Sequence, residues 1–134
     1  MAAMKLSLSI DAATIGKLLA VPAVVALLES YDCKRPMVKV SDSGVSIKAT
    51  IRGTRCKVKL GLGALDGALV VDIRDVRTGD MMLSVGGDWL EPWIAKYIPA
   101  WTRTQNSLAW RIPNLHFRAI GTQGDTLHVI CEVT

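Results

Sequence analysis

Residues 38–76 read VKVSDSGVSIKATIRGTRCKVKLGLGALDGALVVDIRDV, and this stretch decides the fold. Apolar and polar residues alternate through it, and short polar turns separate the alternating segments. The clearest alternation puts apolar residues on one parity (Val45, Ile47, Ala49 and Ile51) and polar residues on the other (Ser46, Lys48, Thr50 and Arg52). Because successive side chains of a strand point to opposite faces, the pattern predicts a sheet with one apolar and one polar face.

The turns divide this stretch into four predicted strands, at residues 37–41, 44–52, 55–62 and 68–75. The segments between them are rich in Gly, Asp and Ser, which accept positive φ or form turn hydrogen bonds. Residues 61–67 contain three glycines but lead into a strand, whereas a phosphate-binding loop leads into a helix. We therefore expect a hairpin turn at residues 63–67.

The segment before this stretch predicts one strand and one or two helices. Met4, Leu6, Leu8 and Ile10 alternate with polar residues, and Asp11 is placed to cap a following helix. Proline at position 22 predicts either a kink or the start of a second helix. Residues 22–30, PAVVALLES, are apolar nearly all round, which predicts burial on several sides. The apolar run is shorter than the ~18 residues of a membrane span and lacks the cleavage pattern of an export signal.

The C-terminal third predicts a short strand through Met81, Leu83 and Val85, an amphipathic helix, and two closing strands. The first closing strand runs over 108–119 with a bulge or an edge at Pro113, and the second covers 127–133. Asp88 and Glu91 have the spacing of a capping box. The apolar stripe of the helix is Leu90, Trp93, Ile94, Tyr97, Ile98 and Trp101. We expect a single domain over residues 1–134, of the α+β class, with a curved, largely antiparallel sheet packed against two main helices.

Positive charge is concentrated in one part of the chain. The 134 residues carry a net charge of +4, yet residues 34–59 hold eight basic residues against one acidic residue, Asp42. The predicted basic surface consists of Lys48, Arg52, Arg55, Lys57 and Lys59. It is either the solvated face of the sheet or a surface for anionic partners. Residues 37–60 contain no aromatic residue for stacking on bases, so nucleic acid is not favoured as a partner.

The cysteines do not form a metal-binding or redox motif. Cys33, Cys56 and Cys131 lack the CxxC spacing, and three cysteines cannot all pair within one chain. Cys56 and Cys131 fall on apolar parities, so they are predicted to be small buried apolar residues. A reducing cytoplasm is the simplest compartment for this pattern.

No catalytic constellation is evident in the sequence. His116 and His128 lie on the polar parity of the closing strands and would approach each other only if those strands pair suitably. A metal site there would need a further ligand, for which Glu132 is the nearby candidate. No serine lies in a G-x-S-x-G motif. We therefore predict a protein that is not an enzyme and has no catalytic residues, metal or cofactor.

The pattern of turns and apolar residues resembles the TULIP-type lipid-binding fold in its short bacterial form. The matching places are SGVSI at 43–47, PNL at 113–115 and GDTLHV at 124–129. The resemblance implies that the sheet wraps a helix and binds acyl chains between them. Such proteins are usually secreted, periplasmic or membrane-attached, whereas we expect no export signal in this chain.

The leading prediction is therefore the binding of a lipid or another apolar small molecule between a curved sheet and helices. The predicted lining residues are Ile47, Ile51, Val58, Leu60, Trp93, Ile94 and Tyr97. The basic strands would dock the protein on an anionic membrane surface, which predicts a cytoplasmic, membrane-peripheral protein. One alternative is a protein-interaction or assembly module, such as a homo-oligomer, that uses a sheet edge or the Trp-rich helix. A further alternative is contact with a nucleic-acid backbone through the basic strands.

Overall fold

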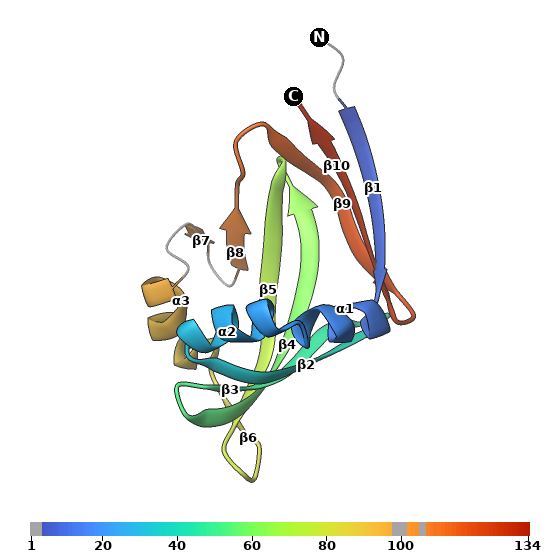
Figure 1. Cartoon of the computed structure of the whole chain (residues 1–134). Coiled ribbons are helices and arrows are strands. Elements are labelled where there is room, and N and C mark those ends of the chain that lie inside the picture. Colours follow the sequence, from blue (N-terminus) through green and yellow to red (C-terminus); the bar gives the residue numbers. More distant parts are fainter. Residues whose placement is uncertain (1–3, 98–101, 105–106) are drawn as a thin grey trace.

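The computed structural model of the chain describes residues 4–97, 102–104 and 107–134 (Figure 1). Its strands form a three-stranded sheet, in the order β1-β10-β9, and a seven-stranded sheet, in the order β2-β3-β4-β5-β8-β7 with β6 also paired to β5. The strands are β1 (Met4–Asp11), β2 (Cys33–Ser41), β3 (Gly44–Ile51), β4 (Thr54–Leu65), β5 (Ala68–Thr78), β6 (Leu83–Val85), β7 (Thr102–Thr104), β8 (Ser107–Trp110), β9 (Leu115–Gln123) and β10 (Thr126–Val133). The predicted α+β class and the curved, largely antiparallel sheet are confirmed.

Three short α-helices occur among the described residues, where two main helices were expected. They are α1 (Ala12–Leu19), α2 (Pro22–Ser30) and α3 (Glu91–Tyr97), with a 3₁₀ turn, η1 (Gly87–Trp89), before α3. The Asp11 side chain accepts a 2.7 Å hydrogen bond from the Thr14 backbone N–H, which confirms the predicted cap. Pro22 begins a second helix rather than kinking the first, and α2 is bent from α1 by 76°.

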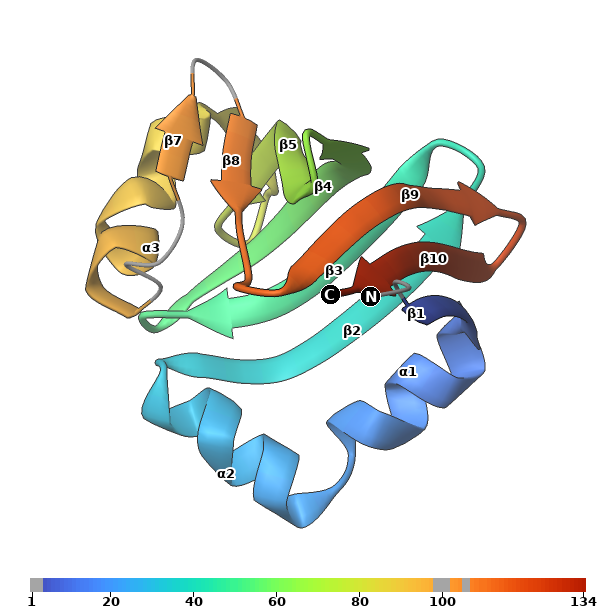
Figure 2. The ribbon, with the colours of Figure 1, turned by 90° about the horizontal axis from the view of Figure 1, so that it is seen from above.

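The prediction that residues 22–30 are buried on several sides is wrong. None of the described residues of α2 is buried, and Val25 and Leu27 are exposed. The cause is position, since α1 and α2 run alongside β2 at the rim of the fold (Figure 2). Only one side of α2 therefore meets the protein.

Several predicted boundaries also differ from the structure. Residues 63–65 belong to β4, and the turn is the pair Asp66 and Gly67, with φ of 51° and 82°. Positive φ at both positions suits a tight hairpin, so the ladder extends closer to the turn than the glycines suggested. Met81 lies outside β6, and Asp88 lies within η1, just before α3. Ile98 and Trp101 of the predicted stripe lie outside the described residues.

The chain passes from one sheet to the other between β8 and β9. Pro113 and Asn114 form this turn, with Asn114 at a φ of 66°, and Ile112 and Leu115 bridge across it. Beyond the turn, β9 contacts β2, β3, β4 and β5 while pairing with β10. The two sheets therefore pack against each other through β9.

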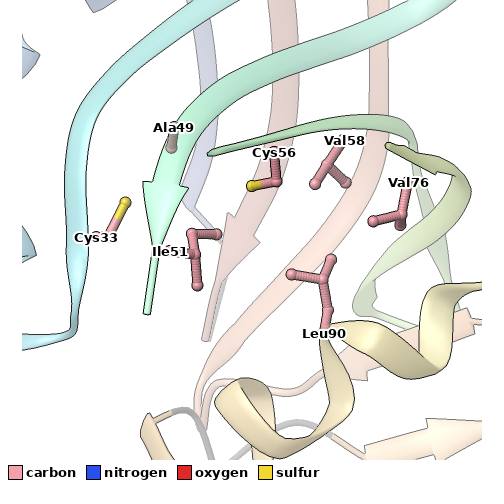
Figure 3. Close-up of a cluster of buried hydrophobic side chains, with 7 residues drawn as sticks. All are labelled: Cys33, Ala49, Ile51, Cys56, Val58, Val76 and Leu90. Carbon is pink, nitrogen blue, oxygen red and sulfur yellow. The ribbon is translucent and has the colours of Figure 1, made fainter. Parts of the chain in front are cut away.

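The main core lies on the apolar face of the seven-stranded sheet. Cys56 and Val76 are the largest of the fully buried side chains among the described residues, each 1% exposed. Figure 3 shows Leu90, which precedes α3, reaching toward Ile51 and Val58 on the strands. The face predicted to be apolar from its period-two pattern is thus the face on which α3 and its flanking turn pack.

Candidate apolar binding site

An apolar pocket of about 340 Å³ lies on the core face of the seven-stranded sheet. Strands β3 and β4 provide much of its floor, through Ile47, Ala49 and Ile51 and, on the neighbouring strand, Val58 and Leu60. These residues share one face because β3 and β4 pair antiparallel in a regular register, with Ile47 opposite Val58. The floor is therefore a direct product of the alternation in the sequence.

Residues of the helices and of the turn before α3 line the sides of the pocket, which stays partly open to solvent. Leu19 of α1 and Leu28 of α2 line it on one side, and Leu90, Trp93 and Ile94 line it on another. All seventeen of the described residues around it are apolar. An apolar surface with no hydrogen-bonding partner attracts a ligand by the hydrophobic effect and selects against polar groups.

Six of the seven predicted lining residues surround this pocket. These six residues are Ile47, Ile51, Val58, Leu60, Trp93 and Ile94. Tyr97, the seventh, does not line it. Sequence reasoning missed Leu19 and Leu28, because their contribution depends on the bend between α1 and α2. It also missed Cys56, although Cys56 shares the parity of Val58 and Leu60.

Tyr97 belongs instead to a group that joins α3 to the connection between α2 and β2. Trp93 Nε1 donates a 2.5 Å hydrogen bond to the carbonyl oxygen of Tyr31, and the Tyr97 hydroxyl donates one to the Asp32 carboxylate. The rings of Tyr31 and Tyr97 are 5.6 Å apart, and those of Trp93 and Tyr97 are 6.1 Å apart. We call Tyr31, Asp32, Trp93 and Tyr97 the aromatic clasp. Because Trp93 also lines the pocket, the clasp fixes one of its walls.

Two thiols lie within the pocket wall. Cys33 and Cys56 are both free and buried, and burial raises the pKa of each thiol above its ordinary value. The thiolate is the nucleophile, so we expect both groups to react slowly with alkylating reagents. Cys131 is also free and buried, but it lies on β10 and does not line this pocket. The three cysteines thus provide chemical probes inside and outside the pocket.

The predicted basic surface lies on the opposite face of the seven-stranded sheet. Lys48, Lys57 and Arg77 occupy directly paired positions on β3, β4 and β5. Arg55 and Lys59 share the parity of Lys57, whereas Arg52 ends in the turn after β3 at a φ of 54°. These residues share a face because the apolar parity of the same strands lines the pocket.

One acidic residue offsets part of this charge. Asp75 accepts a 2.9 Å hydrogen bond from Arg77 Nε, and this contact lowers the pKa of the Asp75 carboxyl group. Asp75 is also paired with Lys59 across the sheet. The row formed by Lys48, Lys57 and Arg77 nevertheless places like charges directly opposite one another, which is unfavourable.

The two histidines are not brought together. His116 pairs with Glu132 and His128 pairs with Gly121, so the rings lie at different levels of the β9–β10 ladder. His128 Nδ1 is 2.8 Å from the Ser9 hydroxyl oxygen, which gives this ring a local partner. Over the described ranges, no group of three His, Cys, Asp or Glu side chains has the arrangement of a metal site.

The described helices offer little for crossing a membrane. No single described helix is long and apolar enough to span a membrane, and only the bent pair of α1 and α2, taken together, has the length and composition of a span.

Comparison with known proteins adds no assignment, since no protein-family model, curated protein or solved structure matches this chain.

Proposed function

We propose that the protein binds an apolar ligand, with a lipid acyl chain as the leading candidate, in the pocket between the seven-stranded sheet and its helices. The observation that carries the proposal is the wholly apolar lining of a pocket of about 340 Å³. Ligand pockets span roughly 300–1,000 Å³, so this volume suits one slender chain. The TULIP-type resemblance points to the same class of ligand and remains a prediction.

Burial of apolar surface would supply the binding free energy. Transfer from water contributes roughly 25 cal/mol per Å² of apolar surface, before the cost of ordering the ligand is subtracted. The sheet floor is held by strand pairing on both sides, so little reorganisation of the protein is needed there.

Thiol protection tests the proposal at the pocket itself. The purified protein would be treated with iodoacetamide with and without a saturating fatty acid, and alkylation of each cysteine followed by mass spectrometry. We expect the ligand to slow alkylation of Cys33 and Cys56, because it covers the wall they belong to. Cys131 is the internal control, since it lies outside the pocket. Equal slowing of all three cysteines would indicate global stabilisation instead, and no slowing together with no lipid in native mass spectra would refute the proposal.

The basic face supports a location for this binding at anionic membrane surfaces. Its cations lie on the face opposite the pocket, so contact with a membrane would leave the pocket walls undisturbed. The test is sedimentation with vesicles of neutral or anionic phospholipid at two salt concentrations. We expect binding to the anionic vesicles alone and its loss at high salt, because surface charges are screened. Equal binding to both types of vesicle would contradict this role.

A second candidate function is self-assembly through the edge strand β1. Met4, Leu6 and Leu8 lie on the face of β1 that continues the Cys131 side of β10, yet they are 64%, 39% and 53% exposed. The outer edge of β1 has no partner among the described strands. Exposed apolar edges of this kind pair readily with another strand.

A second copy of the chain is the partner that fits this edge. An antiparallel pairing centred on Ser7 would place Leu6 opposite Leu8 of the second copy and Lys5 opposite Ser9. No like charges would face each other in that register. Sedimentation velocity should then show a dimer that Leu8→Lys converts to a monomer, whereas a wild-type monomer at high concentration would exclude this candidate.

A further inference from the structure

A second hollow adjoins the apolar pocket and differs from it in chemistry. It measures about 470 Å³ and lies between α1, α2 and the start of β2. Leu19 and Pro36 line both cavities, so the two cavities are direct neighbours. The second hollow also contains charged side chains, namely Glu29, Lys34 and Arg35.

The two cations face the same hollow because the strand is irregular there. Consecutive residues of a regular strand point to opposite faces, yet Lys34 and Arg35 both line this cavity. Pairing between β2 and β3 shifts between Lys34 and Met37, and Arg35 has a φ of 52°. Such an irregularity redirects a side chain and leaves a strand locally unpaired. The chain thus gathers two positive charges in the hollow beside the apolar pocket.

These charges are available to a ligand. Both side chains are exposed, and within the described part of the chain neither makes a hydrogen bond or an ion pair through its charged group. Glu29 is the one carboxylate lining the hollow, so the cations outnumber it there. Arg35 can hold a carboxylate, sulfate or phosphate through two parallel hydrogen bonds, and Lys34 adds a point charge.

We propose that the protein binds a single-chain anionic amphiphile, with its chain in the apolar pocket and its charged head on Lys34 and Arg35. This inference rests on the proposed function for the position of the chain. The division is physically favourable, because the head stays in a hydrated, positively charged hollow while only the chain is removed from water. Free fatty acids and single-chain phospholipids or sulfates share this chemistry.

Calorimetric titration with three probes, each with a linear ten-carbon chain, tests the head-group site. The probes are decanoate and decyltrimethylammonium, each below its micellar concentration, and decanol below its solubility limit. We expect decanoate to bind the wild-type protein roughly tenfold more tightly than decanol, as befits charge-assisted hydrogen bonds at an exposed site. Decyltrimethylammonium should bind more weakly than decanol, because the hollow is positively charged. Decyl phosphate and lysophospholipid then distinguish the source of the anionic head.

Charge-neutralising variants locate the effect. Lys34→Gln with Arg35→Gln should abolish the preference for decanoate over decanol while leaving decanol affinity unchanged. The matched control is Lys57→Gln with Lys59→Gln, which removes the same charge from the opposite face and should keep the preference. Equal wild-type affinity for decanoate and decanol, or a preference for the cationic probe, would overturn the head-group site but not the proposed function. Failure of all three probes to bind would overturn the proposed function itself.

Discussion

Affinity for linear amphiphiles should rise with chain length and then level off where the pocket is full. The pocket holds about 340 Å³. A water molecule occupies about 30 Å³ of the liquid, and a methylene group is of similar size, so a chain of about eleven carbon atoms fills the pocket. Each buried methylene contributes about 0.8 kcal/mol, which is about a fourfold change in Kd.

A wall substitution makes this prediction specific to the pocket. Ala49 is 7% exposed and lines the pocket floor, so Ala49→Leu inserts side-chain volume where the ligand would lie. The leucine adds about three carbon groups, and the levelling point should move to chains about three carbons shorter. Ala13→Leu is the matched control, because Ala13 is exposed on α1 and should leave the profile unchanged.

The assay is isothermal titration with saturated fatty acids from six to sixteen carbons. We expect a linear rise in binding free energy followed by a plateau. An affinity that keeps rising to the longest chain would refute a pocket of this size. An unchanged profile in Ala49→Leu would refute the assignment of the ligand to this pocket, provided that thermal unfolding shows the variant to be folded.

Three further predictions concern stability and use urea or thermal unfolding. Lys57→Glu should raise the free energy of unfolding by up to about 1 kcal/mol, because it places an acidic group between Lys48 and Arg77 on the adjacent strands. A loss of stability would contradict that reasoning. Gly44→Ala should lower the free energy of unfolding by about 1–3 kcal/mol, since φ is 131° there and the new Cβ would lie 2.3 Å from the Leu60 carbonyl oxygen. Gly53→Ala is the comparison, and it should lower stability less, because nothing lies within 4 Å of its Cβ position. Asp11 has a pKa below its ordinary 3.8 because it accepts hydrogen bonds at the start of α1, so its charge stabilises the fold above that value and this contribution is lost as pH falls through the lowered pKa. Wild type should therefore exceed Asp11→Asn in stability near neutral pH and converge with it in acid, and a gap independent of pH would count against this.

The strands could be predicted well because their signal is local. Alternation along β3 fixes which residues face the core, and the pocket floor follows from it. The hairpin turn was predicted to begin at Gly63, because glycine is a poor strand former in isolation, whereas β4 continues to Leu65. Pairing of Gly63 with Val70 of β5 supplies the ladder bonds that override this preference.

The helical part of the site was less predictable for a physical reason. Composition shows that Leu19, Val25, Leu27 and Leu28 are apolar, but not how much surface is left for them to cover. The bend between α1 and α2 directs Leu19 and Leu28 to the pocket and leaves Leu27 in solvent. Tyr97 lay on the predicted apolar stripe, yet its hydroxyl group donates a hydrogen bond to the Asp32 carboxylate, outside the pocket.

The aromatic clasp has a consequence for the rates of ligand exchange. It fastens α3 to the connection before β2 through hydrogen bonds that can open and close without unfolding the sheet. Affinity depends on the difference between bound and free states, whereas exchange rates depend on how often a wall of the pocket opens. Tyr97→Phe removes the hydrogen bond to Asp32 without changing a residue that lines the pocket. We therefore expect association and dissociation to accelerate by the same factor, so that residence time is set by the clasp and Kd by the pocket.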